Sequence, residues 1–360
     1  MTAIILPPSL RLSLDDTKVS YKQLGKSGLR VSVPILGCMS FGDSIFQPWI
    51  NSNEAEIDKL LKDAYDCGLN TWDTANVYSN GASERLIGAA IKRHNIPRQK
   101  LVLLSKCWGV VGEEPDIVQL RHGRDMEMSK DYVNQGGLGR TAIFNSVNAS
   151  LERLGTPYLD LLQIHRFDYT VQIEETMKAL HDLVESGKVR YIGASSMWAY
   201  QFAAMQYCAE VHGWTKFISM QNHYSLCYRE EEREMNPLCH SMDVGLIAWA
   251  PLCRGLLARP PGSARTTREE TMRLHPQFEE LSESDIVIIS RVQEIAKKRG
   301  WEMSQVALAW VISKGSIPVV GLNSSNRLMS AVGIRGKSLT SDEVKYIEAP
   351  YRPKEVEGHF

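Results

Sequence analysis

Hydrophobic and polar positions follow two alternating patterns along this chain, from about residue 35 to about residue 335. Short apolar runs, typical of buried strands, alternate with longer segments whose apolar residues recur every three or four positions, as on one face of a helix. We expect strands at Pro34–Cys38, Asn70–Asp73, Leu101–Ser105, Leu159–Ile164, Arg190–Ala194, Phe217–Met220, Gly245–Trp249 and Ile317–Val320. We expect helices at Asn53–Cys67, Ser83–His94, Arg140–Leu154, Ile173–Ser186, Trp198–His212, Glu230–Met242, Asp285–Arg299 and Ser324–Val332.

Strict alternation of strands and helices predicts a parallel sheet of the α/β class. Eight repeats without an intervening linker favour a closed (β/α)₈ TIM barrel, and a doubly wound sheet with an appended domain is the alternative. The segment 21–31 predicts a β-hairpin that plugs one end of the barrel. Long loops at 108–139 and 251–284 leave the carboxyl ends of strands. We divide the chain into an extension (1–20), the barrel (21–350) and a tail (351–360).

Composition narrows the possible functions. The 360 residues carry a net charge of −1, so no charge argument supports binding to nucleic acid or to an anionic membrane. No apolar run approaches the roughly 20 residues that a membrane-spanning helix needs, and no signal peptide is evident. The seven cysteines show no C-x-x-C pair, which favours a reducing, cytoplasmic location, and no metal-binding motif is present.

One glycine motif has to be set aside. The residues from Gly137 to Ala142 formally match the dinucleotide pattern G-x-G-x-x-A. That pattern requires a buried strand directly before it, to bring the tight turn up to a pyrophosphate. The preceding residues 128–135 are polar and aperiodic, so we interpret these glycines as loop residues ahead of an ordinary helix.

Four polar residues lie at the carboxyl ends of neighbouring predicted strands. Asp73 ends the second strand and Tyr78 follows it, Lys106 ends the third strand, and His165 ends the fourth. Taken singly, a histidine here is more often structural and a tyrosine is usually packing or surface. A lysine this close to an apolar core needs a partner, which Asp73 can supply. Because adjacent strands lie about 4.8 Å apart, we expect the four side chains to meet on one rim.

This group of residues suits carbonyl reduction. A carbonyl that accepts hydride develops negative charge on oxygen, and a proton donor is needed there. A phenol with a pKa of about 10 is a better acid and base when an ammonium lowers that pKa. The sequence therefore predicts Tyr78 as the acid, Lys106 as its modulator, Asp73 as the anchor of Lys106, and His165 as the group that orients the carbonyl oxygen.

Motifs along the chain resemble those of the aldo-keto reductase superfamily over about residues 21–350. The matching stretches are Leu36–Gly42, Asp73–Tyr78, Gly81–Glu84, Ser105–Lys106, Gln163–Arg166, Ile192–Ser196, Gln221–Ser225, Trp249–Leu257 and Val319–Ser324. More narrowly, the segments 220–233 and 353–359 resemble fungal reductases of secondary metabolism of the versiconal hemiacetal acetate reductase type.

The resemblance implies a barrel that binds NADP(H) without a Rossmann domain. It implies nicotinamide contacts at Ser195 and Gln221 and contacts to the 2′-phosphate at Ser324 and Arg327. Further cofactor contacts would come from Met39, Asp73, Ala250, Pro251, Leu252, Arg254, Gly255 and Leu257. Ser330 and Ala331 depart from the common adenine-binding pattern. Phe46, Trp49 and Trp108 on rim loops would join His165 around the substrate.

Two functions remain open at this stage. The first is an NADPH-dependent reductase that acts on an aldehyde, a ketone or a hemiacetal-masked carbonyl of a small aromatic or polyketide-type molecule. The second is a non-catalytic subunit that senses NADP(H) for a partner, as in the similar potassium-channel β subunits. The four rim residues are compatible with both, and turnover of a simple aldehyde separates them. The oligomeric state is not predicted.

Overall fold

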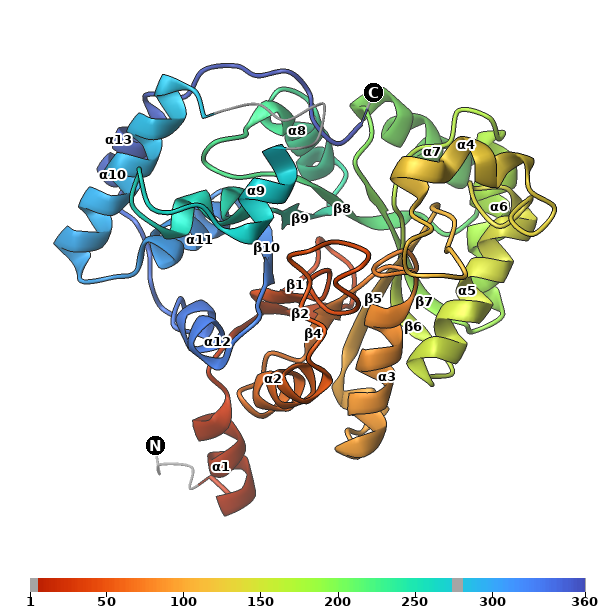
Figure 1. The fold of residues 1–360 in the computed structure, drawn as a ribbon, viewed down its shortest axis with the longest axis horizontal. Coiled ribbons are helices and arrows are strands. Elements are labelled where there is room, and N and C mark those ends of the chain that lie inside the picture. The colour runs from red at the N-terminus through yellow and green to blue at the C-terminus, as the bar shows by residue number, and fades with distance from the viewer. Residues whose placement is uncertain (1–5, 274–280, 360) are drawn as a thin grey trace.

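The strands close into a barrel (Figure 1). The computed structural model describes residues 6–273 and 281–359. Eight parallel strands are hydrogen-bonded in the order β10-β3-β4-β5-β6-β7-β8-β9, which returns to β10. They are β3 (Ile35–Gly37), β4 (Thr71–Asp73), β5 (Val102–Cys107), β6 (Leu159–Ile164), β7 (Val189–Ser195), β8 (Phe217–His223), β9 (Gly245–Trp249) and β10 (Ile317–Gly321). The predicted (β/α)₈ barrel is confirmed, and the doubly wound alternative is excluded.

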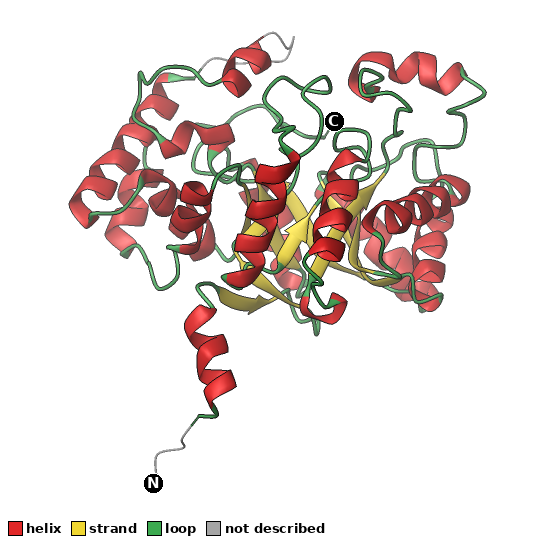
Figure 2. Cartoon of the chain, turned by 60° about the horizontal axis from the view of Figure 1, so that its bottom comes forward, coloured by secondary structure: helices red, strands yellow, loops and turns green. Residues whose placement is uncertain are grey.

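Helices surround the strands on the outside of the barrel (Figure 2). Those predicted from the sequence are α2 (Glu54–Asp66), α3 (Ala82–Arg93), α5 (Arg140–Leu154), α6 (Ile173–Glu185), α7 (Ala199–His212), α10 (Glu283–Arg299) and α12 (Ser325–Val332). The single helix expected at 230–242 was wrong. It is a 3₁₀ turn, η2 (Glu230–Glu232), followed by α8 (Met235–Ser241), because Glu234 adopts a non-helical φ of −139° between them.

Several helices were not predicted, and their sequences explain why. They are α1 (Pro8–Asp16), α4 (Gln119–Met128), α9 (Thr267–Arg273), α11 (Met303–Ser313) and α13 (Ser341–Glu348), with short 3₁₀ turns η1 (Arg98–Lys100) and η3 (Cys253–Ala258). Helix α11 is buried along nearly its whole length, with Trp310 fully enclosed. A helix that is apolar on every side has no amphipathic period to detect. The others lie in terminal or loop segments.

A hairpin closes the amino-terminal end of the barrel. Strands β1 (Ser20–Gln23) and β2 (Arg30–Val33) pair antiparallel, as predicted. Their apolar side chains enter the barrel in one cluster formed by Leu24, Val31, Val33, Ile35, Leu104, Leu161, Ile247, Ile317 and Val319. Gly25 turns the hairpin at φ +60°, and a Cβ there would lie 2.2 Å from the Asp243 carbonyl oxygen. This end is therefore filled, which leaves chemistry to the opposite face.

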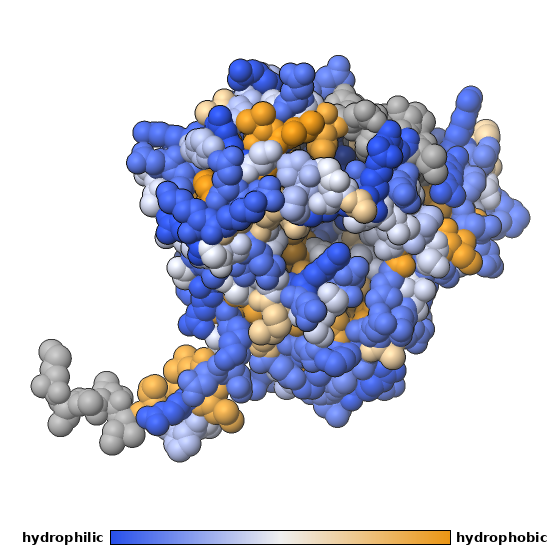
Figure 3. Space-filling view, turned by 60° about the vertical axis from the view of Figure 1, so that its left-hand side comes forward, coloured by the Kyte–Doolittle hydropathy of each residue, from blue (hydrophilic) through white to orange (hydrophobic). Residues whose placement is uncertain are grey.

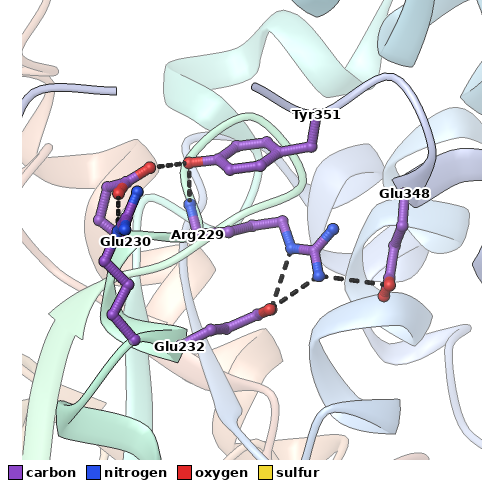
Figure 4. Close-up of a pocket in the computed structure, with 6 residues that line it drawn as sticks. Arg229, Glu230, Glu232, Glu348 and Tyr351 are labelled. Carbon is purple, nitrogen blue, oxygen red and sulfur yellow. Dashed lines mark hydrogen bonds and ion pairs between the residues drawn. The ribbon is translucent and has the colours of Figure 1, made fainter. Parts of the chain in front are cut away.

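The carboxyl-terminal face carries the long loops and the end of the chain. The chain leaves α13, crosses this face and ends near α7 (Figure 1). Tyr351 secures the crossing, since its hydroxyl donates to Glu230 Oε1 and accepts from the Arg229 N–H (Figure 4). The hollow lined by these residues is a network of paired charges, in which Arg229 also pairs with Glu232 and Glu348. We assign this cluster an anchoring role.

At the other end, α1 projects from the barrel with Leu10, Leu12 and Leu14 exposed, beside the grey terminus in Figure 3. Helix α1 has no buried residue. Within residues 6–273 and 281–359, no helix combines the length and apolarity that crossing a membrane requires.

Candidate active site

The structure brings the four predicted rim residues together at the carboxyl ends of β4, β5 and β6. The Lys106 ammonium donates to Asp73 Oδ2 at 2.6 Å, to the Thr74 carbonyl at 2.9 Å and to the Tyr78 hydroxyl at 3.3 Å. The rings of Tyr78 and His165 meet edge to face, with centroids 5.9 Å apart. An unbroken chain of contacts therefore runs from a buried carboxylate through an ammonium to a phenol.

Asp73, like Lys106, has three side-chain hydrogen-bond contacts. Besides Lys106, its Oδ1 accepts hydrogen bonds from the side-chain amides of Gln163 and Gln221, each at 3.0 Å. Asp73 and Lys106 are only 2% and 1% exposed. A buried ion pair is stable when its remaining lone pairs and N–H groups are also hydrogen-bonded, as they are here. Removing either partner would leave the other charge buried and unpaired. Lys106 is consequently held at one position beneath Tyr78.

The pKa of Tyr78 is set by a different balance of effects from the one expected from the sequence. Burial raises its pKa, Lys106 lowers it and Asp73 raises it, so that the pKa stays above the usual value of 10. Lys106 lowers the pKa as expected, but burial outweighs it. For Lys106, burial lowers the pKa, but Asp73 and Tyr78 together raise it above 10.5. At neutral pH the site thus holds a protonated phenol against a charged ammonium.

His165 supplies a neutral ring beside that phenol. Burial, followed by the positive charges of Arg166 and Lys106, lowers its pKa well below 6.5. Its backbone N–H donates to the Cys107 carbonyl at 2.9 Å, which fixes the residue at the end of β6. A neutral imidazole can donate a hydrogen bond to a substrate oxygen without adding a charge to the site.

Strands β7, β8 and β9 form the adjoining wall. The Ser195 hydroxyl donates to the Gln221 carbonyl at 2.7 Å. Trp249 donates its ring N–H to Ser196 Oγ at 3.1 Å and stacks on His223 at 4.2 Å. His223 is stacked on its other side by Tyr228 at 4.1 Å. This aromatic stack holds Trp249, which is not fully buried, as a flat ring beside Ser196.

The loop after β9 has an unusual backbone. Ala250, Cys253 and Arg254 adopt positive φ angles between 48° and 57°, and Gly255 reaches 105°. Left-handed backbone at three non-glycine residues carries strain that surrounding contacts must support. One such contact is the ion pair from Arg254 to Glu357 at 2.7 Å. The loop and the chain end therefore constrain each other. Pro251, Leu252 and Leu257 lie in the same loop, and Leu257 is buried.

Ser324 and Arg327 lie apart from the rim, at the start of α12. The Ser324 side chain caps the helix by accepting from the Arg327 N–H at 3.4 Å. The Arg327 guanidinium is exposed and donates to Asn323 Oδ1 at 2.9 Å. Open backbone N–H groups beside a guanidinium are suited to an anion.

Two groups near the site were missed from the sequence. Arg268 on α9 places its guanidinium 4.4 Å from the centre of the Trp49 ring. Its Nε is buried without a hydrogen-bond partner in the described part of the chain. Burial and the charge of Arg254 lower the pKa of Arg268 to about 10. Long loops have no readable conformation, so no sequence signal could have placed Arg268 here.

The chain end is the second missed group. His359 meets Trp198 edge to face at 4.6 Å, and a Cβ on Gly358 would lie 3.0 Å from the Trp249 ring. Burial and the charge of Arg166 lower the pKa of His359 to about 4. Of the other predicted wall residues, Trp108 packs against the core and Phe46 is partly buried. Met39, predicted as a cofactor contact, is 41% exposed.

The glycines at 137–139 are loop residues, as interpreted from the sequence. Gly137 does not follow a strand, because turns precede it. Helix α5 comes next, with Gly139 as the N-cap of that helix. The Gly137 N–H donates to the Trp108 carbonyl at 2.7 Å.

Comparisons with known proteins agree with this architecture. Residues 35–352 match the Aldo/keto reductase family. The chain is 52% identical over 359 residues to an aldo-keto reductase of Fusarium vanettenii, covering 98% of this chain and 97% of that protein. It is 49% identical to versiconal hemiacetal acetate reductase of Aspergillus parasiticus (94% and 98% covered) and 46% identical to a putative aryl-alcohol dehydrogenase of Schizosaccharomyces pombe (94% and 98% covered). The chain therefore belongs to the aldo/keto reductase family of oxidoreductases.

Proposed function

We propose that this protein is an NADPH-dependent reductase that converts an aldehyde, ketone or hemiacetal-masked carbonyl of an aromatic or polyketide-type molecule to the alcohol. The observation that carries the proposal is the contact chain Asp73–Lys106–Tyr78, with a neutral His165 beside the phenol. The similarity to a hemiacetal acetate reductase and to a putative aryl-alcohol dehydrogenase supports the substrate class.

Each rim residue has a distinct task in the reaction. Tyr78 donates its phenolic proton to the carbonyl oxygen as negative charge develops there. Lys106, held by Asp73, stays charged and stabilises the phenolate that remains, until a proton from solvent restores the hydroxyl. His165 hydrogen-bonds the same oxygen and sets the orientation of the carbonyl. The nicotinamide supplies the hydride when it is bound.

The residues present fit such a cofactor. Arg254, in the loop after β9, pairs with Glu357, and its charge lowers the pKa of Arg268, whose buried Nε has no hydrogen-bond partner among the described residues. The two guanidinium groups therefore lie close together. A diphosphate is an anion of suitable charge for them. Trp249 offers a flat surface to a planar ring, and Ser195 and Gln221 offer polar side chains beside it. Ser324 and Arg327 would hold the 2′-phosphate. Met39, Asp73, Ala250, Pro251, Leu252, Gly255 and Leu257 stay as proposed further contacts.

The substrate would lie against aromatic walls. Phe46, Trp49 and Trp108 come from two loops over the same face, and we assign them with His165 to the substrate side. Arg268 already covers one face of Trp49. The wall is therefore polar at one edge and apolar elsewhere, which suits an aromatic carbonyl compound that carries oxygen substituents.

Turnover tests the proposal directly. The purified protein should oxidise NADPH, followed by absorbance, in the presence of 4-nitrobenzaldehyde and of a panel of aromatic aldehydes, ketones and quinones. The matched control is Tyr78→Phe, which should bind NADPH but not turn over. NADPH binding without turnover across the panel would contradict the enzyme and favour the cofactor-sensing subunit.

A further inference from the structure

Helix α7 is apolar on both of its faces. Its inner face packs Phe202, Met205 and Ala209 into the core of the barrel. Its outer face presents Tyr200, Ala204, Tyr207 and Val211, and all four are exposed. The exposed fractions of the two tyrosines and the valine are 67%, 71% and 60%. Helices that are apolar all round are normally buried on all sides, but no segment within residues 6–273 and 281–359 covers the outer face of α7.

The four outer residues form a continuous stripe. They are spaced by four, three and four positions, which is the spacing of an a/d seam in a pair of packed helices. We call these residues, 200, 204, 207 and 211, the α7 stripe. Single exposed apolar residues need no explanation, but an aligned set along three turns of one helix marks an interaction surface.

The charge on α7 supports this interpretation. Among the 14 residues of α7, Glu210 is the only Asp, Glu, Lys or Arg, and it is paired with Lys216. The neighbouring helix α6 carries five such residues in 13 positions: Glu174, Glu175, Lys178, Asp182 and Glu185. Both helices belong to the same outer ring (Figure 1). Loss of charged residues together with enrichment in tyrosine distinguishes the centre of a protein interface from ordinary surface.

We propose that the α7 stripe is the contact surface for a second copy of this chain, with the two α7 helices antiparallel about a two-fold axis between Met205 and Gln206. In that register Ala204 faces Tyr207 of the other copy, and Tyr200 faces Val211. Each large side chain therefore opposes a smaller one, and every contact occurs twice. A surface that is complementary to itself in this way is what a two-fold dimer requires.

A parallel arrangement of the two α7 helices fits the stripe less well. A parallel pair would place Tyr207 against Tyr207 and leave a gap between the two Ala204 residues. The antiparallel pair fills the space above Ala204 with the ring of Tyr207. The net charge of −1 per chain also produces little repulsion between two copies. Helix α7 lies on the opposite side of the molecule from α1, so α1 does not obstruct the approach (Figure 1).

The size of the stripe sets the expected affinity. Two tyrosines that are about two-thirds exposed offer roughly 300 Å² per chain, since a fully buried aromatic side chain covers about 150–250 Å². A standard interface buries about 800 Å² per partner, so the stripe is its apolar centre and flanking polar residues complete it. We therefore expect a reversible dimer that dissociates on dilution, not a permanent one.

Sedimentation velocity of the full chain tests the dimer. Wild-type protein should shift from monomer to dimer across a range of about 1 to 300 µM, because mass action governs the equilibrium. Tyr207→Glu should raise the dissociation constant at least about 100-fold, because two tyrosines are lost and two charges enter each interface. Val287→Glu on α10, an apolar residue that is 41% exposed, is the control and should dimerise as wild type does. Thermal unfolding and NADPH turnover confirm that Tyr207→Glu still folds.

Cross-linking tests the register. A mixture of Ala204→Cys and Tyr207→Cys chains should form a disulfide-linked pair under mild oxidation, whereas Ala204→Cys alone should not. Wild-type protein under the same oxidant controls for the native cysteines. A monomer at the highest concentration, or dimerisation of Tyr207→Glu at the wild-type affinity, would overturn the interface. Cross-linking of Ala204→Cys with itself would overturn the antiparallel register.

Discussion

The rim of the barrel and the start of α12 hold the two charged parts of the site in opposite ways. On the rim, Lys106 is buried and meets three acceptors, and its partner Asp73 receives three donors. At α12, Arg327 is exposed, and among the described residues its guanidinium donates only to Asn323. Lys106 and Asp73 on the rim are therefore fully hydrogen-bonded, whereas the Arg327 guanidinium at α12 still has N–H groups available to a ligand.

The roles proposed for the two parts account for this difference. A group that moves a proton must be held in one geometry, which buried and redundant hydrogen bonds provide. A group that selects a phosphate must have donors available for it, at a small cost in the free protein. We therefore expect changes on the rim to reduce turnover by large factors, and changes at α12 to alter cofactor affinity by smaller ones.

The largest effect is expected for Tyr78→Phe. It removes the proton donor but leaves the cofactor contacts, so kcat should fall by about 10²–10⁴-fold while the NADPH dissociation constant stays near the wild-type value. Steady-state turnover and fluorescence titration measure the two quantities. Tyr132→Phe, which removes a hydroxyl on the loop after β5, is the control. Near-normal kcat in Tyr78→Phe would remove Tyr78 from the role of acid.

Lys106→Met should come next and should also move the pH profile. Lys106 lowers the pKa of Tyr78, so its loss raises that pKa further above 10. Alcohol oxidation needs the phenolate, and its rate should therefore rise at a higher pH than in wild type, with a large loss of kcat at neutral pH. The profile of kcat for oxidation between pH 6 and about 11 measures this.

Two variants control that experiment. Lys92→Met removes an exposed lysine of α3 and should leave the profile unchanged. Lys106→Met leaves Asp73 buried without its cation, which destabilises the fold. The double variant Lys106→Met/Asp73→Asn removes both charges and should restore stability without restoring the profile. A wild-type profile in an active Lys106→Met protein would contradict the modulating role.

Much of the rim was predictable from the sequence because strand ends fix positions. Asp73, Lys106 and His165 each end a short apolar run, and parallel strands bring such ends to one edge. Tyr78 lies only five residues beyond Asp73, which limits how far it can be from the rim. The contacts of Asp73 with Gln163 and Gln221 were not predicted, since two amides on other strands have no local signal for a shared acceptor.

The long loops could not be predicted in the same way. Arg268 is separated from β9 by a segment without regular period, and only the folded loop brings it to Trp49. Residues 357–359 follow α13 with no apolar pattern, yet they contact Arg254 and Trp198. Their positions depend on side-chain pairing between distant segments, which hydrophobic period does not encode.

A second buried carboxylate, that of Glu231, can be compared with the carboxylate of Asp73. Glu231 is 5% exposed, and its Oε2 accepts from the Asn222 amide at 2.7 Å. Unlike Asp73, it has no salt bridge within residues 6–273 and 281–359. Burial raises its pKa to about 7, with Asn222 lowering it and Glu230 raising it. Asp73 is thus paired with a cation, whereas among the described residues Glu231 is not.

Glu231→Gln should therefore stabilise the protein at alkaline pH. Between pH 4.5 and about 7 the folded state keeps a proton that the unfolded state has released, so stability falls as pH rises. A pKa raised from 4.5 to about 7 corresponds to about 3 kcal/mol lost above pH 7. The glutamine variant avoids that loss and keeps an acceptor for Asn222.

Denaturant unfolding at pH 5 and pH 8 measures this effect. The gain from Glu231→Gln should be about a quarter of its full value at pH 5 and nearly full at pH 8. Glu234→Gln, an exposed residue nearby, should change neither value. Asp73→Asn should have the opposite sign and destabilise the protein at both values. Equal stability of Glu231→Gln and wild type at pH 8 would mean that Glu231 is ionised and paired in the folded state.

The smallest effect concerns cofactor choice at α12. If Arg327 and the start of α12 share the 2′-phosphate of NADPH, Arg327→Ala should raise the NADPH dissociation constant by roughly 10–150-fold, since charge-assisted hydrogen bonds contribute about 1.5–3 kcal/mol. NADH lacks that phosphate, so its binding should hardly change. Added salt should reduce the difference between variant and wild type, because the guanidinium is exposed.

Fluorescence titration of both cofactors against both proteins separates this role from a structural one. Arg335→Ala, an exposed arginine just after the same helix, should leave both affinities unchanged. Equal weakening of NADPH and NADH by Arg327→Ala would assign the residue to the adenine or to the fold. The 2′-phosphate would then have to be held by another cation. The exposed guanidinium of Arg327 would no longer be a group that is kept available for an anion, and the contrast with the hydrogen-bonded groups of the rim would not hold.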